Sequence, residues 1–286
     1  LELLRIESHL SNKNTKSKIA LDINFVRDAF SNLFELGYLN FKSGQGFCLK
    51  PDMQMAICIH LKHNTDTHIW VKSIRQLLNN HNEYQNWKAH NVAFCRREML
   101  LSALDDDIDG FFDWRSKFFL TQYENSHNLG EIFFSSDNGK ELFSLISPII
   151  QTTLLSDIFH DANWFLNDCK AAYEYAKSNF KALAINFSEF VDSFSLQTLL
   201  RGDYEQLLLI LDKVPKENTY HLQSIYAAQQ GDFISALQSM NAYTALIKKQ
   251  TGKRKIYIPD IVGLFYLLII LVSKDEKQSL FAKEQL

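Results

Sequence analysis

The side chains with the clearest chemical potential lie in a short basic stretch near the end of the chain. Five cations occur within eight residues, at Lys248, Lys249, Lys253, Arg254 and Lys255. Clustered Lys and Arg bind the phosphate backbone of nucleic acids because each contact releases condensed counterions. The stretch therefore predicts a nucleic-acid contact, with a solvated loop between two helices as the alternative.

Part of the same stretch, Thr251-Gly252-Lys253, resembles the end of a nucleotide-binding phosphate loop. That motif needs another glycine five residues before Gly252, where this chain has Ile247, and a strand in front of it. Neither requirement is met, so we expect no nucleotide and no other cofactor here.

An acidic run, Asp105–Gly110, matches the opening of a calcium loop, in which alternate oxygens surround the ion. The twelfth position of such a loop is a bidentate Glu, and here it is Ser116. The change removes two of about seven oxygen ligands. The pattern therefore favours a solvated loop that caps a helix.

No other constellation predicts catalysis or metal binding. His60 and His63 share a helix face, but no Cys or acidic residue nearby completes a zinc site. His160-Asp161 is a lone pair of a kind that is common by chance. We therefore expect no catalytic residue, no metal and no enzyme activity in this segment.

Composition indicates a mainly helical protein with a substantial core. Of 286 residues, 46% are hydrophobic and 13% aromatic, whereas only 4 are Pro and 10 are Gly. So few turn residues argue for long helices rather than many short strands. The net charge of -3 gives no overall attraction to nucleic acid, so any such contact must be local.

The cysteines and the longest apolar run bear on where the protein works. The 4 cysteines form no CxxC pair, which predicts free thiols and a cytoplasmic location. The apolar run Ile261–Val272 is too short to cross a bilayer, so we expect no membrane contact. Because the chain starts at Leu1 and stops inside an amphipathic pattern, we expect a fragment of a longer polypeptide.

Residues 1–50 resemble a winged helix. Leu1–Leu10 is an expected first helix, and Asp22–Leu36 is an amphipathic helix that ends before a glycine. The alternating segments Tyr38–Phe41 and Gly46–Leu49 predict a β-hairpin.

This module offers two candidate contacts to nucleic acid, Arg27 in the second helix and Lys42 in the hairpin. Residues 1–50 carry seven basic and five acidic side chains, so their net charge is +2. That charge is low for a protein that reads duplex DNA. A packing or protein-contact role is therefore the alternative for the module.

From residue 51 onward the sequence predicts helices almost throughout. Residues 51–177 form an expected helical middle region with a loop at Ser135–Gly139. The short apolar segment Glu131–Phe134 fits either a helix or a strand. The helices expected in this region and just beyond it cover Met53–His63, His68–Leu78, Tyr84–Leu104, Phe111–Tyr123, Lys140–Asp157, Asp161–Lys177 and Ala182–Phe194.

Residues 178–286 contain a short sequence motif that occurs twice. Gly202-Asp203-Tyr204 recurs 29 residues later as Gly231-Asp232-Phe233, and each copy separates two helical patterns. Glycine accepts the left-handed conformation that ends a helix, and Asp caps the next helix. The expected helices are Tyr204–Val214, Tyr220–Gln229, Phe233–Lys248, Leu264–Val272 and Gln278–Leu286.

These helix pairs resemble tetratricopeptide-like repeats. In that family a small residue follows the aromatic after three positions and a large apolar residue follows four later, as in Phe233, Ala236 and Met240. Leu207 is larger than the family's residue, the 29-residue spacing is short, and the Trp-Leu-Gly-Tyr signature is absent. The resemblance implies a helical solenoid that binds a partner.

The expected fold is therefore mostly α. It consists of a winged-helix-like module over residues 1–50, a helical middle region over 51–177 and a tetratricopeptide-like α-solenoid over 178–286.

The stretch from Ala242 to Ile269 is similar to part of the N-terminal, non-motor region of bacterial Snf-like (Swi/Snf-type) ATP-dependent helicases. The likeness consists of a helix, the phrase Thr251–Lys255, an extended Tyr257-Ile258-Pro259 and an apolar helix that opens at Gly263. It implies a non-catalytic regulatory and interaction region, which positions DNA or a protein partner against an ATP-binding motor. The motor's own motifs are absent from this chain.

Other readings stay open. A winged helix followed by paired helices also fits the sensor region of a signalling-ATPase transcriptional activator of the maltose type, in which the concave face of the stack binds an effector or inhibitor. A stand-alone scaffold and an enzyme without a familiar motif are further alternatives.

Overall fold

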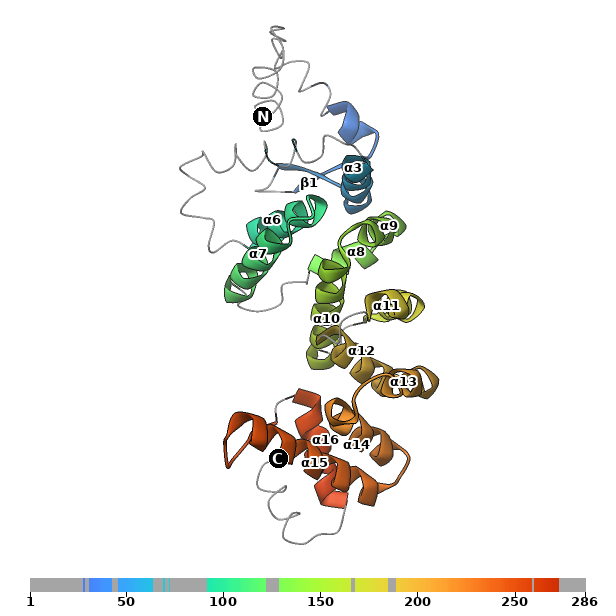
Figure 1. The fold of residues 1–286 in the computed structure, drawn as a ribbon. Coiled ribbons are helices and arrows are strands. Elements are labelled where there is room, and N and C mark those ends of the chain that lie inside the picture. Colours follow the sequence, from blue (N-terminus) through green and yellow to red (C-terminus); the bar gives the residue numbers. More distant parts are fainter. Residues whose placement is uncertain are drawn as a thin grey trace. The chain divides into compact units, whose positions relative to one another are not determined.

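The computed structural model describes residues 28, 31–42, 46–63, 69, 72, 92–121, 129–165, 168–184, 189–258 and 260–272. The chain divides into two compact units, Leu1–Leu154 and Leu155–Leu286, with the boundary inside helix α10 (Pro148–Phe165). The described residues are mainly helical, as the sequence predicts (Figure 1). The domain limits predicted at residues 50 and 177 do not coincide with this division and stay predictions.

A β-hairpin forms where the sequence predicts one. Strand β1 (Leu39–Lys42) pairs antiparallel with β2 (Gly46–Leu49). Gly37 stands between the helical residues 31–35 and β1 with a φ of 76°, the left-handed conformation that ends a helix.

The first unit also contains helices that pack around buried aromatic rings. They are α3 (Pro51–His63), α6 (Val92–Leu104), α7 (Ile108–Thr121), α8 (Leu129–Phe134), α9 (Asp137–Leu145) and the start of α10. Helix α6 packs against α7, and α9 packs against α3 and α8. The ring of Phe143 in α9 is fully buried and meets Phe133 of α8 edge to face, with 5.4 Å between ring centroids.

Two of the helices expected in the middle region are interrupted. The segment Lys140–Asp157 divides between α9 and α10, because Pro148 has no N–H to continue a helix and suits the first turn of a new one. Asp161–Lys177 likewise divides between α10 and α11 (Lys170–Leu183).

The loop expected at Ser135–Gly139 is shorter than predicted. Helix α9 begins at Asp137, and the Ser136 hydroxyl caps it by accepting a hydrogen bond of 3.1 Å from the N–H of Gly139. Gly139 is therefore a helical residue. A Cβ there would lie 2.3 Å from the carbonyl oxygen of Phe133, so glycine allows α9 to approach α8.

The second unit consists of helices in sequence order. They are the rest of α10, α11, α12 (Glu189–Leu200), α13 (Tyr204–Leu211), the 3-10 helix η1 (Lys216–Thr219), α14 (Tyr220–Gln229), α15 (Phe233–Thr251) and α16 (Asp260–Val272). The helix expected at Ala182–Phe194 is divided between α11 and α12. Helix α13 is shorter than expected and α15 is longer.

Aromatic rings hold the start of this unit together. Phe194 of α12 is fully buried, and its ring lies 5.8 Å from Phe159 of α10 and 5.4 Å from Tyr173 of α11, measured between centroids. Phe180 of α11 and Phe190 of α12 lie 5.4 and 5.7 Å from the same ring. Side chains from three helices thus share one aromatic core.

The two Gly-Asp-aromatic motifs form the turns that the sequence predicts. Gly202 and Gly231 have φ values of 70° and 82°, which is the left-handed conformation. Asp203 and Asp232 then cap α13 and α15 by accepting hydrogen bonds from the N–H groups of Gln206 and Ser235, three residues on.

Contacts between the helix pairs continue along the unit. Helix α14 packs against α12, α15 and α16 (Figure 1). The close crossing of α14 and α15 depends on small residues: Ala236 is fully buried, and the hydroxyl of Ser224 donates to its carbonyl at 2.7 Å. Val262 of α16 packs against the buried residues of both apolar clusters in this region.

Several expected elements lie outside the described residues. These are Leu1–Leu10, most of Asp22–Leu36, nearly all of His68–Leu78, and Gln278–Leu286. Within the part of the chain that is described, no helix combines the length and apolar character needed to cross a membrane.

Candidate nucleic-acid interface

The basic stretch occupies the end of α15 and the loop that follows. Lys248 and Lys249 lie in the last turn, and Gly252 ends the helix with a φ of 68° while its N–H donates to the carbonyl of Lys248 at 2.9 Å. Cations at this position also stabilise the negative end of the helix dipole. Lys253, Arg254 and Lys255 follow in non-helical chain.

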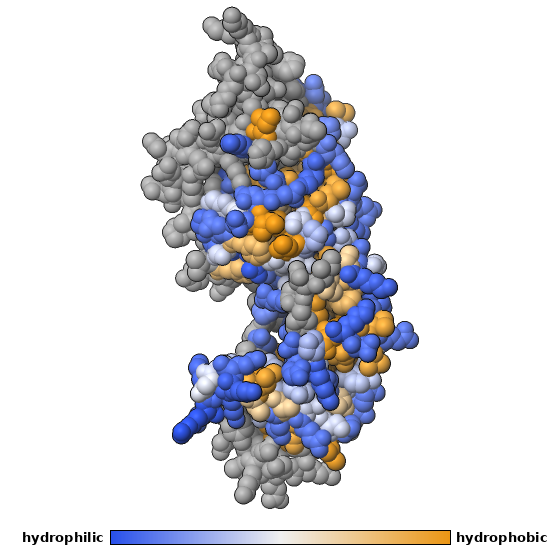
Figure 2. All heavy atoms as spheres, in the orientation of Figure 1, coloured by the Kyte–Doolittle hydropathy of each residue, from blue (hydrophilic) through white to orange (hydrophobic). Residues whose placement is uncertain are grey.

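All five cations are exposed, and no described carboxylate forms an ion pair with them. Lys177 in the same unit, by contrast, pairs with Asp203. Figure 2 shows mostly hydrophilic side chains at this end of α15. The charge of the basic stretch is therefore available to an anionic ligand.

The far end of the loop is fixed to the core. Ile258 packs against the buried cluster of Ala236, Met240 and Ile269. Its carbonyl oxygen would lie 2.1 Å from a Cβ on Gly263, so only glycine permits this approach. Gly263 was expected to open an apolar helix, but that helix, α16, begins three residues earlier and Gly263 lies inside its first turn.

The other two predicted contacts, Arg27 and Lys42, stay predictions. Arg27 lies outside the described residues, and Lys42 is the last residue of β1 in the first unit. Among the described residues of the second unit, the structure brings together Lys248, Lys249, Lys253, Arg254 and Lys255.

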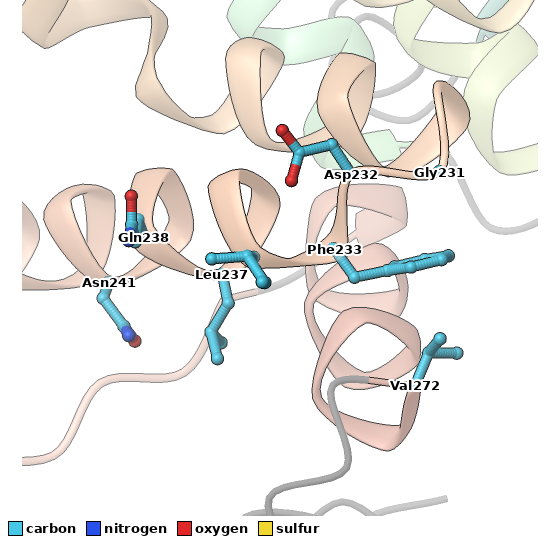
Figure 3. Close-up of a pocket in the computed structure, with 8 residues that line it drawn as sticks. Gly231, Asp232, Phe233, Leu237, Gln238, Asn241 and Val272 are labelled. Carbon is cyan, nitrogen blue, oxygen red and sulfur yellow. The ribbon is translucent and has the colours of Figure 1, made fainter.

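A shallow apolar groove lies at the opposite end of α15. Its volume is about 520 Å³, and its lining comes from the second Gly-Asp-aromatic turn, the first turns of α15 and Val272 of α16. Phe233 and Val272 face the same open side, whereas the carboxylate of Asp232 points away from Val272 (Figure 3). The only ionisable group of the lining is Asp232, whose carboxylate caps α15, so the groove has no group for acid–base chemistry.

The first Gly-Asp-aromatic turn has a different environment. Asp203 accepts hydrogen bonds from the Tyr173 hydroxyl at 2.8 Å and from Lys177, both on α11. Burial alone would raise the pKa of Asp203, but these two hydrogen bonds and the one from the Gln206 N–H outweigh it and lower the pKa below its usual range. No local sequence pattern predicts these contacts, which span 30 and 26 residues.

A buried cysteine lies beside the same turn. The Sγ of Cys169 is 3.0 Å from the guanidinium of Arg201, which also lies over the ring of Tyr173. Burial raises the pKa of the Cys169 thiol despite the opposing effect of Arg201. This burial disfavours the thiolate form that a nucleophilic cysteine requires.

The sequence analysis also missed a His–Asp pair. The Nε2 of His221 lies 2.8 Å from the carboxylate of Asp192, a residue 29 positions earlier, and the imidazole packs against the ring of Tyr243 at 4.9 Å. Such a pair can act as a general base. His221 is only 6% exposed, however, so a substrate cannot reach it, and the pair links α12 to α14.

The acidic run forms the helix-capping loop that the sequence favours. The carboxylate of Asp107 accepts a hydrogen bond of 2.9 Å from the N–H of Gly110 at the start of α7, and Asp106 pairs with Lys62 at 2.6 Å. No group of three or more His, Cys, Asp or Glu side chains in the described residues has a metal-binding arrangement.

The fold and this site describe a mainly helical protein with an exposed cationic loop. No protein-family model, no curated protein and no solved structure matches the chain. A function is therefore proposed from the sequence patterns and the geometry of the described residues.

Proposed function

We propose that this chain is a non-catalytic regulatory and interaction region of a larger Snf-like ATP-dependent helicase, and that it contacts nucleic acid through the basic loop after α15. One observation carries the nucleic-acid contact: five exposed cations within eight residues, none paired with a described carboxylate. Because the loop is anchored at both ends, its cations lose less freedom on binding than those of a free tail would.

The finer architecture belongs to the same proposal. The hairpin after Gly37 supports a winged-helix-like module, and the paired helices around the two Gly-Asp-aromatic turns support a tetratricopeptide-like solenoid. The helicase assignment itself comes from the likeness of Ala242–Ile269. The full reading frame tests it: a motor with a phosphate loop after this segment supports the proposal, and its absence contradicts it.

Binding of a fluorescent oligonucleotide tests the nucleic-acid contact. The double reversal Lys253→Glu with Arg254→Glu is compared with Lys181→Glu plus Lys213→Glu, which changes the net charge equally at exposed lysines elsewhere in the second unit. We expect the first pair to lower the affinity at least tenfold and to flatten its salt dependence, and the control pair to have a small effect. Equal effects of the two pairs would show that the loop is not the contact.

The alternative proposal is the sensor region of a signalling-ATPase transcriptional activator. The groove beside Gly231 favours it, because its volume of about 520 Å³ falls in the range of ligand pockets and its lining is largely apolar. A small, mainly apolar effector would then bind there. Under this alternative, Ile234→Asp abolishes binding of the effector, and a nucleotide-binding module precedes this segment in the reading frame.

A further inference from the structure

The basic loop also carries an unusually exposed aromatic residue. The side chain of Tyr257 is 87% exposed, more than that of any other large hydrophobic residue in the described part of the chain. Its neighbours Ile256 and Ile258 are half-buried. An exposed phenol ring next to the anchored Ile258 suggests a role in contact with a ligand.

The loop holds this ring outward. Exposure alternates along the loop, with Lys255 and Tyr257 exposed and the two isoleucines half-buried, as in a chain whose successive side chains point to opposite sides. Because Ile258 is packed into the core and its carbonyl is held against Gly263, Tyr257 cannot turn inward without unpacking the start of α16. The ring and the Lys255 cation thus share the solvent side of the loop.

A cationic track next to an exposed aromatic ring matches the requirements of a single strand. Bases of a single strand are free to stack on a side chain, and every base offers a face, whereas bases in a duplex are stacked on one another. We infer that this loop binds single-stranded nucleic acid, with one base stacked on Tyr257 and the backbone phosphates on Lys253, Arg254 and Lys255. This inference rests on the proposed function and specifies its ligand.

A protein partner fits the same residues less well. Exposed aromatics do serve as anchors in protein interfaces, but the buried centre of such an interface is depleted in Lys. Tyr257 instead follows three consecutive cations. An acidic peptide remains the competing ligand, and the experiment includes it.

The test measures the fluorescence anisotropy of labelled oligonucleotides with the full 286-residue chain. The probes are a 15-mer of thymidine, a 15-base-pair duplex, a 15-mer of abasic sites and a polyglutamate peptide. We expect Tyr257→Ala to weaken binding of the thymidine oligomer about tenfold, the usual effect of removing one stacked base. Tyr257→Phe restores most of this loss because it keeps the ring.

The abasic oligomer separates stacking from charge. Tyr257→Ala leaves binding of the abasic strand and of the duplex unchanged, since neither offers a free base face. The variant also leaves the salt dependence unchanged because it removes no cation. Far-ultraviolet circular dichroism checks the fold, which an exposed side chain is not expected to disturb.

Each contrary result has a separate meaning. Equal losses on thymidine and abasic strands, no loss on either, or a preference for the duplex would overturn the single-strand inference, while the proposed function would stand if the charge reversal still weakened binding. Binding of polyglutamate without binding of any oligonucleotide would overturn both.

Discussion

The two aspartates of the repeated turns show how one residue acquires different roles from its surroundings. Both cap a helix, but only Asp203 also accepts hydrogen bonds from a preceding helix, through Tyr173 and Lys177. The side chain of Asp203 is 21% exposed in its ion pair, whereas Asp232 lies on the open turn beside the groove. The first copy of the motif therefore links α11 to α13 through Asp203, whereas the second copy only caps α15 through Asp232.

Replacing each aspartate by alanine measures this difference. Asp203→Ala is expected to lower the free energy of unfolding by about 2 kcal/mol, because it removes a helix cap together with contacts to two side chains of α11. Asp232→Ala removes the cap alone and is expected to lose clearly less. Urea denaturation of both variants checks the order, and equal losses would contradict the role given to Tyr173 and Lys177.

The lowered pKa of Asp203 also predicts how stability changes with acid. A carboxyl whose pKa is lower in the folded state stabilises the fold above its unfolded pKa of about 3.9, and this stabilisation disappears as the pH falls through the folded pKa. The stability difference between the natural chain and Asp203→Asn should therefore be constant near neutral pH and shrink below about pH 4. Urea midpoints at pH 6, 4 and 3 test this, and a difference that grows in acid would refute it.

At the scale of elements, glycines set how closely the helices approach. Gly252 provides a left-handed end for α15 in open space, whereas Gly263 lies in α16 directly against the backbone of Ile258. Gly252 is needed for its backbone conformation, and Gly263 is needed because a side chain would not fit. Together the two glycines fix the ends of the loop between α15 and α16.

Alanine at the two positions separates these requirements. Gly252→Ala is expected to lower the free energy of unfolding by about 1 kcal/mol through backbone strain. Gly263→Ala is expected to lose about 3 kcal/mol, because the new methyl group collides with a carbonyl oxygen that the surrounding core holds in place. Thermal unfolding followed by circular dichroism compares them; a smaller loss at Gly263 would show that α16 shifts freely.

The elements that sequence reasoning predicted well are those set by local residues. Gly202 and Gly231 determine their turns within three residues, and the hairpin after Gly37 follows from alternation and a turn. The break at Pro148 was missed because apolar residues continue on both sides of it and conceal the interruption. The partners of Asp203 could not be predicted, since no local pattern encodes which helix packs beside a turn.

The candidate site shows the same division. The five cations are visible in the sequence, but whether a described carboxylate pairs with them depends on which acidic residues lie nearby in space. The outward position of Tyr257 likewise depends on the burial of Ile258 against residues of α15 and α16. The positions of the charged residues could therefore be predicted from the sequence, but the exposure of their side chains and of the Tyr257 ring could not.

At the scale of the whole molecule, the net charge of -3 opposes association with nucleic acid. Any binding must therefore be local, and if it comes from the cationic loop after α15, its dependence on salt should be modest. Three phosphate contacts to a single strand predict a slope of about -2 in a plot of log K against log salt. Titrations of the thymidine oligomer from 50 to 300 mM salt measure it; a slope near zero would exclude phosphate contact, and a much steeper one would require cations outside the loop.

The exposed Lys253–Lys255 loop, tied down only at its ends, is also the natural place for trypsin to cut. A nick there would leave α16 held by its apolar side chains, since Val262, Tyr266 and Ile269 pack in the cluster around Met240. Fragments produced by a cut in this loop should therefore separate on a denaturing gel but still elute together under native conditions. The chain between α15 and α16 would then be dispensable for keeping those helices associated, and a tag could be inserted at this point without dismantling the second unit.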